Sequence, residues 1–140
     1  MSHFLHLNCK AKIILIILCS GMLVGTVTHA NWIFKNGFLS KDYDAPLYAK
    51  LFWDSLTFID PVAALLLLIK PKHGIWLAAI IMIADVLINS YMCVYHGCLN
   101  RTNFTIWLRL NWMLVAQIFF AVFLLSTINY VLKAIRVYTI

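Results

Sequence analysis

The sequence contains no glutamate and little charge of either sign. Its acidic residues are five aspartates, and only 11% of the chain is charged. Soluble domains have about 25% charged and about 45–50% apolar residues. Here 64% of the residues are hydrophobic and the mean hydropathy is +0.90. These values leave too little polar surface for a water-soluble domain.

The motifs of soluble enzymes are also absent. The sequence has no Walker A motif, no Rossmann glycine pattern, no G-x-S-x-G and no His-Glu-x-x-His. Its four cysteines have no zinc or redox spacing: Cys9, Cys19, Cys93 and Cys98. We therefore expect no metal and no cofactor. Without glutamate, any acid–base pair would have to use aspartate and histidine, and whether the chain is an enzyme stays open.

The basic residues are dispersed rather than clustered. The net charge of +6 comes from 11 lysine and arginine residues against five aspartates. Ten of these cations lie in pairs beside the end of an apolar run: Lys10/Lys12, Lys35/Lys41, Lys70/Lys72, Arg101/Arg109 and Lys133/Arg136. Cations at such positions can reach the phosphates of membrane lipids. Nucleic-acid binding, which needs a basic patch, is not expected.

Four apolar runs are long enough to cross a bilayer as helices, which need about 20 residues each. They cover about residues 13–34, 47–69, 75–95 and 106–132. The second and third runs are separated only by residues 70–74, whose proline and glycine indicate a tight turn. We predict an all-α polytopic membrane protein, an antiparallel bundle of four transmembrane helices forming one domain over residues 1–140.

The first run has a second interpretation. Two lysines, an apolar stretch and Thr28-His29-Ala30 resemble a signal peptide with a cleavage site after Ala30. Cleavage there would leave three spans. The length of the run favours retention as a membrane helix.

An even number of spans places both termini on one side of the membrane. Six cationic residues then lie on the terminal side and five on the opposite side, where Asp42 and Asp44 also lie. Positive residues favour the cytoplasmic side, so we expect cytoplasmic termini. A plasma or inner membrane is favoured, or the endoplasmic reticulum in a eukaryote. Cys93 and Cys98 would then lie on the outer side, where they could form a disulfide or stay free.

Three of the five aspartates lie inside the predicted spans. An ionised carboxylate in the middle of a span costs about 2.5–3.5 kcal/mol, so each needs a partner or a wet cavity. A rise of about 1.5 Å per residue places Asp60 and Asp85 near the midplane and Asp54 nearer the outer face. These carboxylates are the strongest candidates for function.

Further polar residues lie in the outer half of the spans. Asn89 follows Asp85 by four residues and so shares its helix face. The combination predicts a polar pocket, shallow on the outer side and closed beneath. Its candidate ligand-binding residues are His29, Asp54, Asp60, Asp85, Asn89, Asn111 and Gln117.

Two of the carboxylates also have purely structural interpretations. Asp54 follows Lys50 by four residues, a spacing that allows an ion pair on the helix surface. Asp60 precedes Pro61, so a carbonyl freed by the proline and the nearby Thr57 could form a hydrogen-bonded kink with it.

Asp85 has no cation within a helical turn. Its partner would have to come from another helix, with His29 or Arg109 as candidates, or the carboxyl would have to be protonated. His29 itself could be an ordinary packed histidine, and Asn111 and Gln117 could simply join helices.

The order of these features resembles the EXPERA family of sterol isomerases and the sigma-2 receptor. The likeness lies in residues 28–32 of the first span, in the segment from Asp54 to Pro61, and in Asp85-Val86-Leu87 together with Asn111. The resemblance implies four helices around an apolar cavity for a sterol-like or cationic amphiphilic ligand near His29, Asp54, Asp85 and Asn111. The isomerases have a glutamate one turn after the histidine, where this chain has Ile33, so isomerase chemistry is not implied.

The sequence as a whole predicts a pocket that binds a lipid-like, sterol-like or amphiphilic molecule. One alternative is a non-enzymatic subunit, in which Asp60, Asp85 and Gln117 face another copy or a membrane partner protein. The other is a proton or small-ion pathway through the carboxylates.

Overall fold

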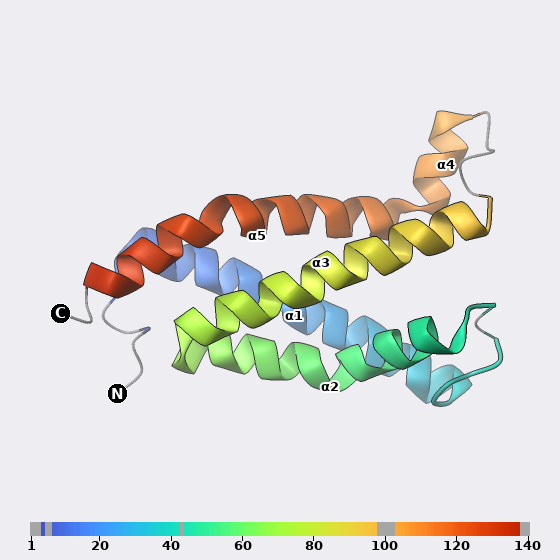
Figure 1. The fold of residues 1–140 in the computed structure, drawn as a ribbon, viewed down its shortest axis with the longest axis horizontal. Helices are drawn as coiled ribbons and strands as arrows, with labels where there is room; N and C mark the ends of the chain where they lie inside the picture. Colours follow the sequence, from blue (N-terminus) through green and yellow to red (C-terminus); the bar gives the residue numbers. More distant parts are fainter. Residues whose placement is uncertain (1–3, 5–6, 43, 98–102, 138–140) are drawn as a thin grey trace.

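The computed structural model describes residue 4 and residues 7–42, 44–97 and 103–137. The described part of the chain is helical, without strands (Figure 1). Its helices are α1 (Cys9–Asn36), α2 (Leu47–Ile69), α3 (Pro71–Tyr95), α4 (Phe104–Leu110) and α5 (Trp112–Val137). The four long helices, α1, α2, α3 and α5, pack against one another as an antiparallel bundle, which confirms the predicted fold class.

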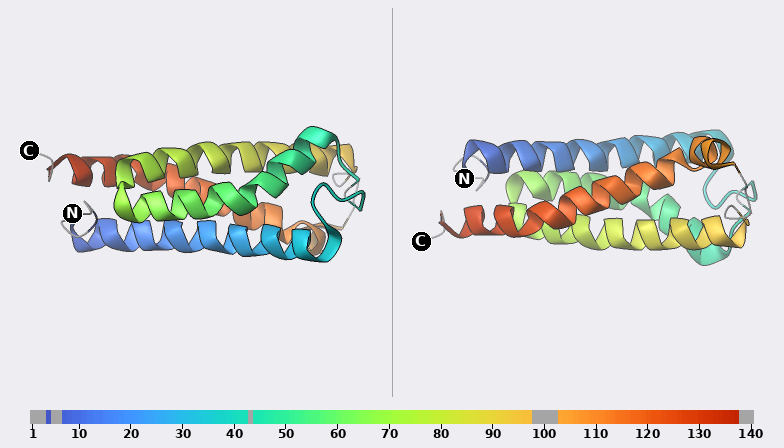
Figure 2. Two further views of the ribbon diagram at one scale, coloured as in Figure 1. Left: turned by 90° about the horizontal axis from the view of Figure 1, so that it is seen from below. Right: turned by 90° about the horizontal axis from the view of Figure 1, so that it is seen from above.

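The bundle has two unlike ends. At the terminal end, α1 begins and α5 ends; the loop end carries the α1–α2 connection and the segment between α3 and α5 (Figure 1). The helices run along one common axis, with α1 against α2, α2 against α3, α3 against α5, and α5 against α1 (Figure 2). At the terminal end, the Tyr130 hydroxyl lies 3.4 Å from Asn8 Oδ1, and Lys10 Nζ lies 5.1 Å from the centroid of the Tyr130 ring.

The first helix starts four residues before the predicted span, at Cys9. The Asn8 side chain caps it by accepting a hydrogen bond of 2.8 Å from the Ala11 N–H, which satisfies one of the free amides of the first turn. The helix ends at Gly37, whose φ of 86° is left-handed and whose N–H donates to the Ile33 carbonyl at 2.8 Å.

The turn between α2 and α3 is shorter than predicted. Lys70 alone separates the two helices, and α3 begins at Pro71 instead of Ile75. Proline is tolerated in the first turn of a helix, where its missing N–H has no intrahelical partner to lose. The N–H groups of His73 and Gly74 donate to the Lys70 carbonyl at 2.9 and 3.0 Å.

The fourth predicted span, residues 106–132, is divided in the structure. Its first residues belong to the short helix α4, and α5 begins only at Trp112. Asn103 caps α4 by accepting from the Thr105 and Ile106 N–H groups at 2.9 and 3.3 Å. The helix ends at Asn111, whose side-chain amide donates to the Trp107 carbonyl at 2.9 Å. Beyond this elbow, α4 runs across the long axis of the bundle (Figure 1).

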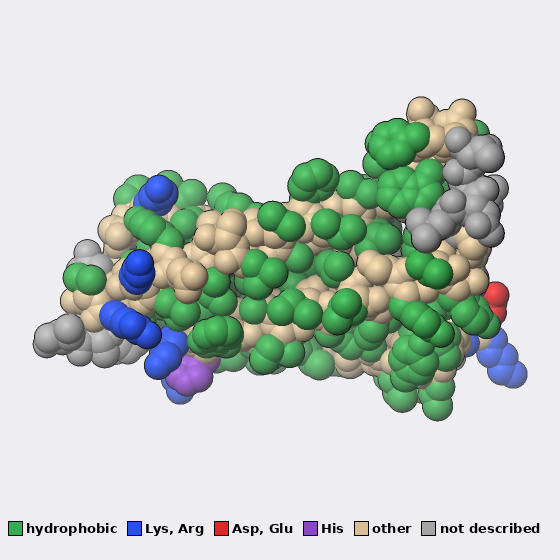
Figure 3. All heavy atoms as spheres, turned by 45° about the horizontal axis from the view of Figure 1, so that its top comes forward, with side chains coloured by type: hydrophobic (Ala, Val, Ile, Leu, Met, Phe, Trp, Pro, Cys, Tyr) green, Lys and Arg blue, Asp and Glu red, His purple; other side chains and the backbone are tan. Residues whose placement is uncertain are grey.

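The outer surface of the bundle is apolar. Large hydrophobic side chains are exposed along every long helix and cover the middle of the molecule (Figure 3). The lysine and arginine side chains in this view lie at the two ends, most of them at the terminal end. An exposed apolar belt of this size is unfavourable in water and matches the hydrocarbon of a bilayer.

Candidate functional site

Two adjoining cavities lie inside the loop-end half of the bundle. The loop-end cavity has a volume of about 530 Å³ and the mid-bundle cavity one of about 360 Å³. Residues of α1 and α5 line both: Thr28, His29, Trp112, Met113 and Gln117. The two spaces therefore share the wall where α1 and α5 face each other.

The mid-bundle cavity combines apolar walls with two carboxylates. Asp60 from α2 and Asp85 from α3 line it and are 3% and 4% exposed. Most of the other side chains around it are apolar, among them Met22, Leu56, Ile81, Met82 and Phe120. Carboxyl groups in such surroundings are strong acceptors with little water to compete for them.

Asp85 is satisfied by its own helix. The Asn89 side-chain amide donates to Asp85 Oδ1 at 2.7 Å and lies 3.1 Å from Gln117 Oε1. The partner that the structure gives Asp85 is thus an amide one turn away on its own helix, and the alternative of a protonated carboxyl stays a prediction. A second helix joins only through Asn89, which links Asp85 to α5.

Asp60 has an oxygen without a protein partner. Its Oδ1 is buried and accepts no hydrogen bond from the described residues, and the same is true of Thr57 Oγ1. The predicted hydrogen-bonded kink of these two side chains before Pro61 is therefore wrong. A buried acceptor left unpaired costs about 1–3 kcal/mol.

Gly25 provides the space for Asp60. A Cβ atom at Gly25 would lie 2.6 Å from Asp60 Oδ2, and one at Gly21 would meet the ring of Phe120. The two glycines are four residues apart on one face of α1, so they let α2 and α5 approach. Sequence reasoning missed them, although the small-x-x-x-small spacing was a readable signal.

Asp54 lies outside both cavities. Its Oδ2 accepts a hydrogen bond of 2.6 Å from the Leu39 N–H, and so it holds the α1–α2 loop against the bundle. The expected ion pair with Lys50 does not form, because Lys50 Nζ donates instead to the Ser40 carbonyl at 3.0 Å.

The loop-end cavity is the more polar of the two. Besides the shared residues it is lined by Asn89, Asn111 and loop residues that include Asp44 and His96, whose Oδ2 and Nδ1 atoms are 3.8 Å apart. Cys93 also lines it, is disulfide-bonded, and has its Sγ 3.6 Å from Asn111 Oδ1.

The remaining cysteines are the possible partners of Cys93 in the predicted disulfide. Cys9 and Cys19 are free thiols. Cys98, the predicted partner of Cys93, lies outside the described residues.

The structure thus brings most of the predicted binding residues to these cavities. Asp60 and Asp85 line the mid-bundle cavity, Asn89 and Asn111 the loop-end cavity, and His29 and Gln117 both. No group of three or more His, Cys, Asp or Glu side chains that could hold a metal ion occurs within the described ranges.

The helices define the class of protein. α1, α2, α3 and α5 are each long and apolar enough to cross a membrane, which identifies an integral membrane protein with a four-helix bundle. No protein-family model matches the chain, and comparisons with curated proteins and with solved structures find no match.

Proposed function

We propose that the mid-bundle cavity binds an amphiphilic molecule whose amine or hydroxyl group donates a hydrogen bond to Asp60. The observation that carries the proposal is the buried, unpartnered oxygen of this carboxylate beside a largely apolar cavity. A protonated amine would supply both the missing donor and a compensating charge. Asp85, already bonded to Asn89, would add negative charge to the same space.

The size and lining of the cavities support such a ligand. Ligand pockets typically measure about 300–1,000 Å³ and combine apolar walls with a few polar groups. The mid-bundle cavity, at about 360 Å³, falls at the lower end of that range. A longer molecule would extend past His29 and Gln117 into the loop-end cavity.

The resemblance to the EXPERA family favours the same ligand class, a sterol-like or cationic amphiphile. It points to Asp54 as the acidic residue of the second helix, however, whereas Asp54 here accepts from the Leu39 N–H. Our proposal therefore assigns the ligand's polar group to Asp60, one helix turn and a half further along α2.

The geometry gives less support to the two alternatives. Assembly through Asp60, Asp85 and Gln117 would need these side chains on the outside, whereas both carboxylates are buried inside the single chain. An ion pathway would need polar groups toward the terminal end. The core there consists, among the described residues, of apolar side chains such as Leu15, Leu18, Leu67, Ile75 and Leu124.

The disulfide supports the predicted orientation. Disulfides persist in oxidising compartments, so Cys93 favours a loop end that faces away from the cytoplasm. The terminal end, with its lysine and arginine side chains, would then be cytoplasmic, as expected in a plasma or inner membrane.

Photolabelling tests the ligand proposal. The protein would be reconstituted in phosphatidylcholine vesicles with a long-chain alkylamine carrying a diazirine, and labelled peptides would be mapped by mass spectrometry. We expect labelling near Met22 and Phe120 that excess unlabelled alkylamine suppresses. Asp60→Asn should raise the half-saturating concentration about tenfold or more, because a hydrogen bond to a charged group contributes about 1.5–3 kcal/mol.

The matched control is Asp54→Asn, the same change on the same helix outside both cavities, where the asparagine oxygen can still accept from the Leu39 N–H. It should label like the unmodified protein. Labelling that is not saturable, or that is equal in Asp60→Asn, would contradict the proposal.

A further inference from the structure

We propose that α4 is a membrane-surface helix. It lies at the boundary between headgroups and acyl chains in the leaflet at the loop end. In that position α4 anchors the elbow that forms one wall of the loop-end cavity. This proposal concerns a helix that lies outside the mid-bundle cavity and has no part in the contact with Asp60. Only the consequence for the cavity rests on the proposed function.

Within the described chain, α4 packs little against the bundle: Trp107 is its one half-buried side chain, with its Nε1 atom buried. None of its side chains is buried, and Phe104, Ile106 and Leu110 are 72%, 51% and 62% exposed. Its sequence is nearly all apolar, with Arg109 as its single charge. In water this helix would expose most of its hydrophobic side chains, which is the pattern of a helix in an apolar or interfacial medium.

The helix is nevertheless well defined. Asn103 closes its first turn with two hydrogen bonds, and the Asn111 amide closes its last turn through the Trp107 carbonyl. A helix of seven residues is marginal in water even with such caps, because most helical stability comes from packing of an apolar face. Its surroundings must therefore supply the stabilisation that the bundle does not.

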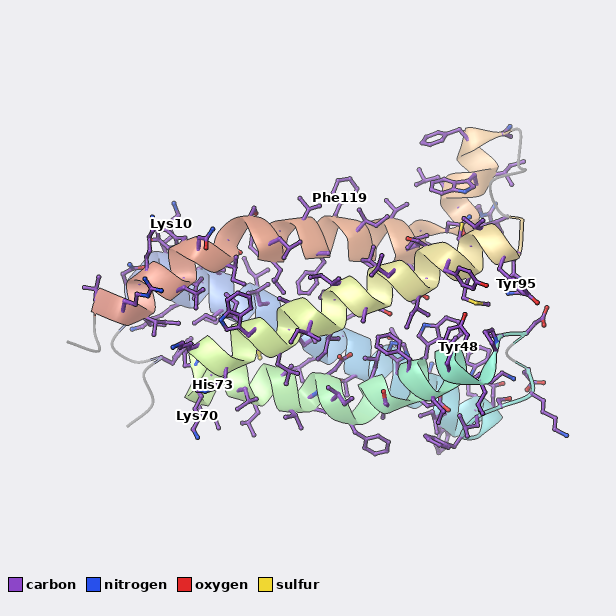
Figure 4. All side chains as sticks on the ribbon, viewed as in Figure 1. Lys10, Tyr48, Lys70, His73, Tyr95 and Phe119 are labelled. Carbon is purple, nitrogen blue, oxygen red and sulfur yellow. The ribbon has the colours of Figure 1, made fainter. Side chains whose placement is uncertain are left out.

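Aromatic residues on the other helices mark the depth at which α4 lies. Tyr48 on α2 and Tyr95 on α3 lie at the loop end and are 52% and 62% exposed (Figure 4). Tyr91, one turn before Tyr95 on α3, is 55% exposed. Exposed tyrosine and tryptophan side chains collect at membrane–water interfaces. Trp112, 62% exposed, starts α5 at this same end. α4 leaves the bundle there and runs across its axis, so it lies along the membrane plane (Figure 1).

The composition of α4 favours lipid over a protein partner. Phe104 and Trp107 stack with their ring centroids 6.1 Å apart, and the Phe104 ring of this pair is exposed to the interface. Arg109 is exposed and can reach a lipid phosphate. Tryptophan, phenylalanine and one basic residue on a short helix are the composition of interfacial anchors.

The position of α4 affects the loop-end cavity because the chain that leaves α4 forms part of the cavity wall. Five consecutive residues, from Leu110 to Leu114, line the loop-end cavity. They form the elbow between α4 and α5, and α4 has no buried side chain to hold that elbow in place. The membrane surface would thus fix the wall that a bound amphiphile contacts.

Electron paramagnetic resonance of a spin label tests the location without any ligand. The label is attached to Ile106→Cys in a Cys9→Ser, Cys19→Ser background, which removes the two free thiols and keeps the disulfide of Cys93. The full chain is reconstituted in phosphatidylcholine vesicles. Collision with oxygen, which concentrates in lipid, is compared with collision with a water-soluble nickel chelate.

We expect the label at position 106 to collide more often with oxygen than with the nickel chelate. The ratio of the two collision rates should lie between the ratios measured at two reference sites. Lys41→Cys in the α1–α2 loop gives the aqueous value and Leu65→Cys, on the exposed face of α2, gives the acyl-chain value. Nickel accessibility equal to that of Lys41→Cys would place α4 in water and overturn the proposal. Low accessibility to both reagents with broadening from label–label coupling would place it against a second copy and would also overturn it.

This measurement and the photolabelling experiment fail independently. A label in water would refute the surface helix and leave the Asp60 site untouched. Failure of photolabelling would refute the ligand and leave the depth of α4 unchanged.

Discussion

Two buried carboxylates on α2 are in opposite situations. Asp54 accepts a hydrogen bond from the Leu39 N–H, whereas Asp60 has a buried oxygen with no partner in the described chain. The first carboxylate stabilises the fold. The second costs free energy in the unliganded protein, as is common for groups kept for binding.

The contrast predicts opposite effects of the same substitution. Asp60→Leu replaces an unpaired buried acceptor by an apolar side chain and should stabilise the ligand-free protein in detergent, by up to about 1–3 kcal/mol. Asp54→Leu leaves the Leu39 N–H unpaired and should destabilise it by a similar amount. Thermal unfolding followed by circular dichroism measures both variants under one condition.

The two measurements control each other, since both variants make the same chemical change in one helix. If Asp60→Leu lowers the melting temperature as much as Asp54→Leu, then Asp60 has a stabilising role that its geometry does not reveal. The idea of a carboxylate kept for a ligand would then lose its energetic basis.

For single residues, the sequence predicted which side chains point into the bundle better than it predicted their hydrogen-bond partners. The cost of a carboxylate in lipid places Asp54, Asp60 and Asp85 inside the bundle, as observed. The partner of Asp54 depends on how the α1–α2 loop folds back, and that is not visible in spacing along a helix. The function of Gly25 likewise depends on which side chain packs opposite it.

Among the elements, the α2–α3 hairpin has the least tolerance for change. A Cβ atom at Gly74 would overlap the backbone of Leu66 and Leu67. Because only Lys70 separates the helices, neither can shift without breaking the turn. Gly74 is therefore required by close approach of two backbones.

We expect Gly74→Ala to destabilise the bundle by about 1–3 kcal/mol, the usual cost of overpacking. The change would be measured by thermal unfolding in detergent. His73→Ala is the matched control, because His73 is exposed on the same turn and should have little effect. Equal melting temperatures for the two variants would show that the helices separate easily, contrary to the tight contact in the structure.

The number of spans could be predicted, and so could both ends of the second (residues 47–69) and the last residue of the third, but not the other ends. Hydropathy averages over about 20 residues, so it finds four runs, but the fourth was predicted at residues 106–132 and α5 covers Trp112–Val137. The ends depend on single hydrogen bonds. Pro71 begins a helix because its ring suits the first turn, and Asn111 breaks the fourth run because its amide turns back to the Trp107 carbonyl. Neither effect changes a hydropathy average.

Across the whole molecule, polarity and charge are distributed unequally between the two ends. All five aspartates lie from the mid-bundle level toward the loop end, and so do both cavities and the disulfide-bonded Cys93. The terminal end has an apolar core and a cationic surface, which includes Lys10 and Lys70 (Figure 4). This asymmetry is what a fixed orientation in the membrane requires.

The orientation can be tested with single cysteines at the two ends. In the Cys9→Ser, Cys19→Ser background, Lys41→Cys places a thiol in the α1–α2 loop and Lys72→Cys places one beside the α2–α3 turn; both positions are exposed. Because disulfides and negative loops favour the non-cytoplasmic side, a membrane-impermeant maleimide added to intact cells should modify Lys41→Cys. Lys72→Cys should react only after permeabilisation. The background protein without either new cysteine measures residual labelling, and the reverse pattern would place the disulfide-bonded end in the cytoplasm and refute the proposed orientation.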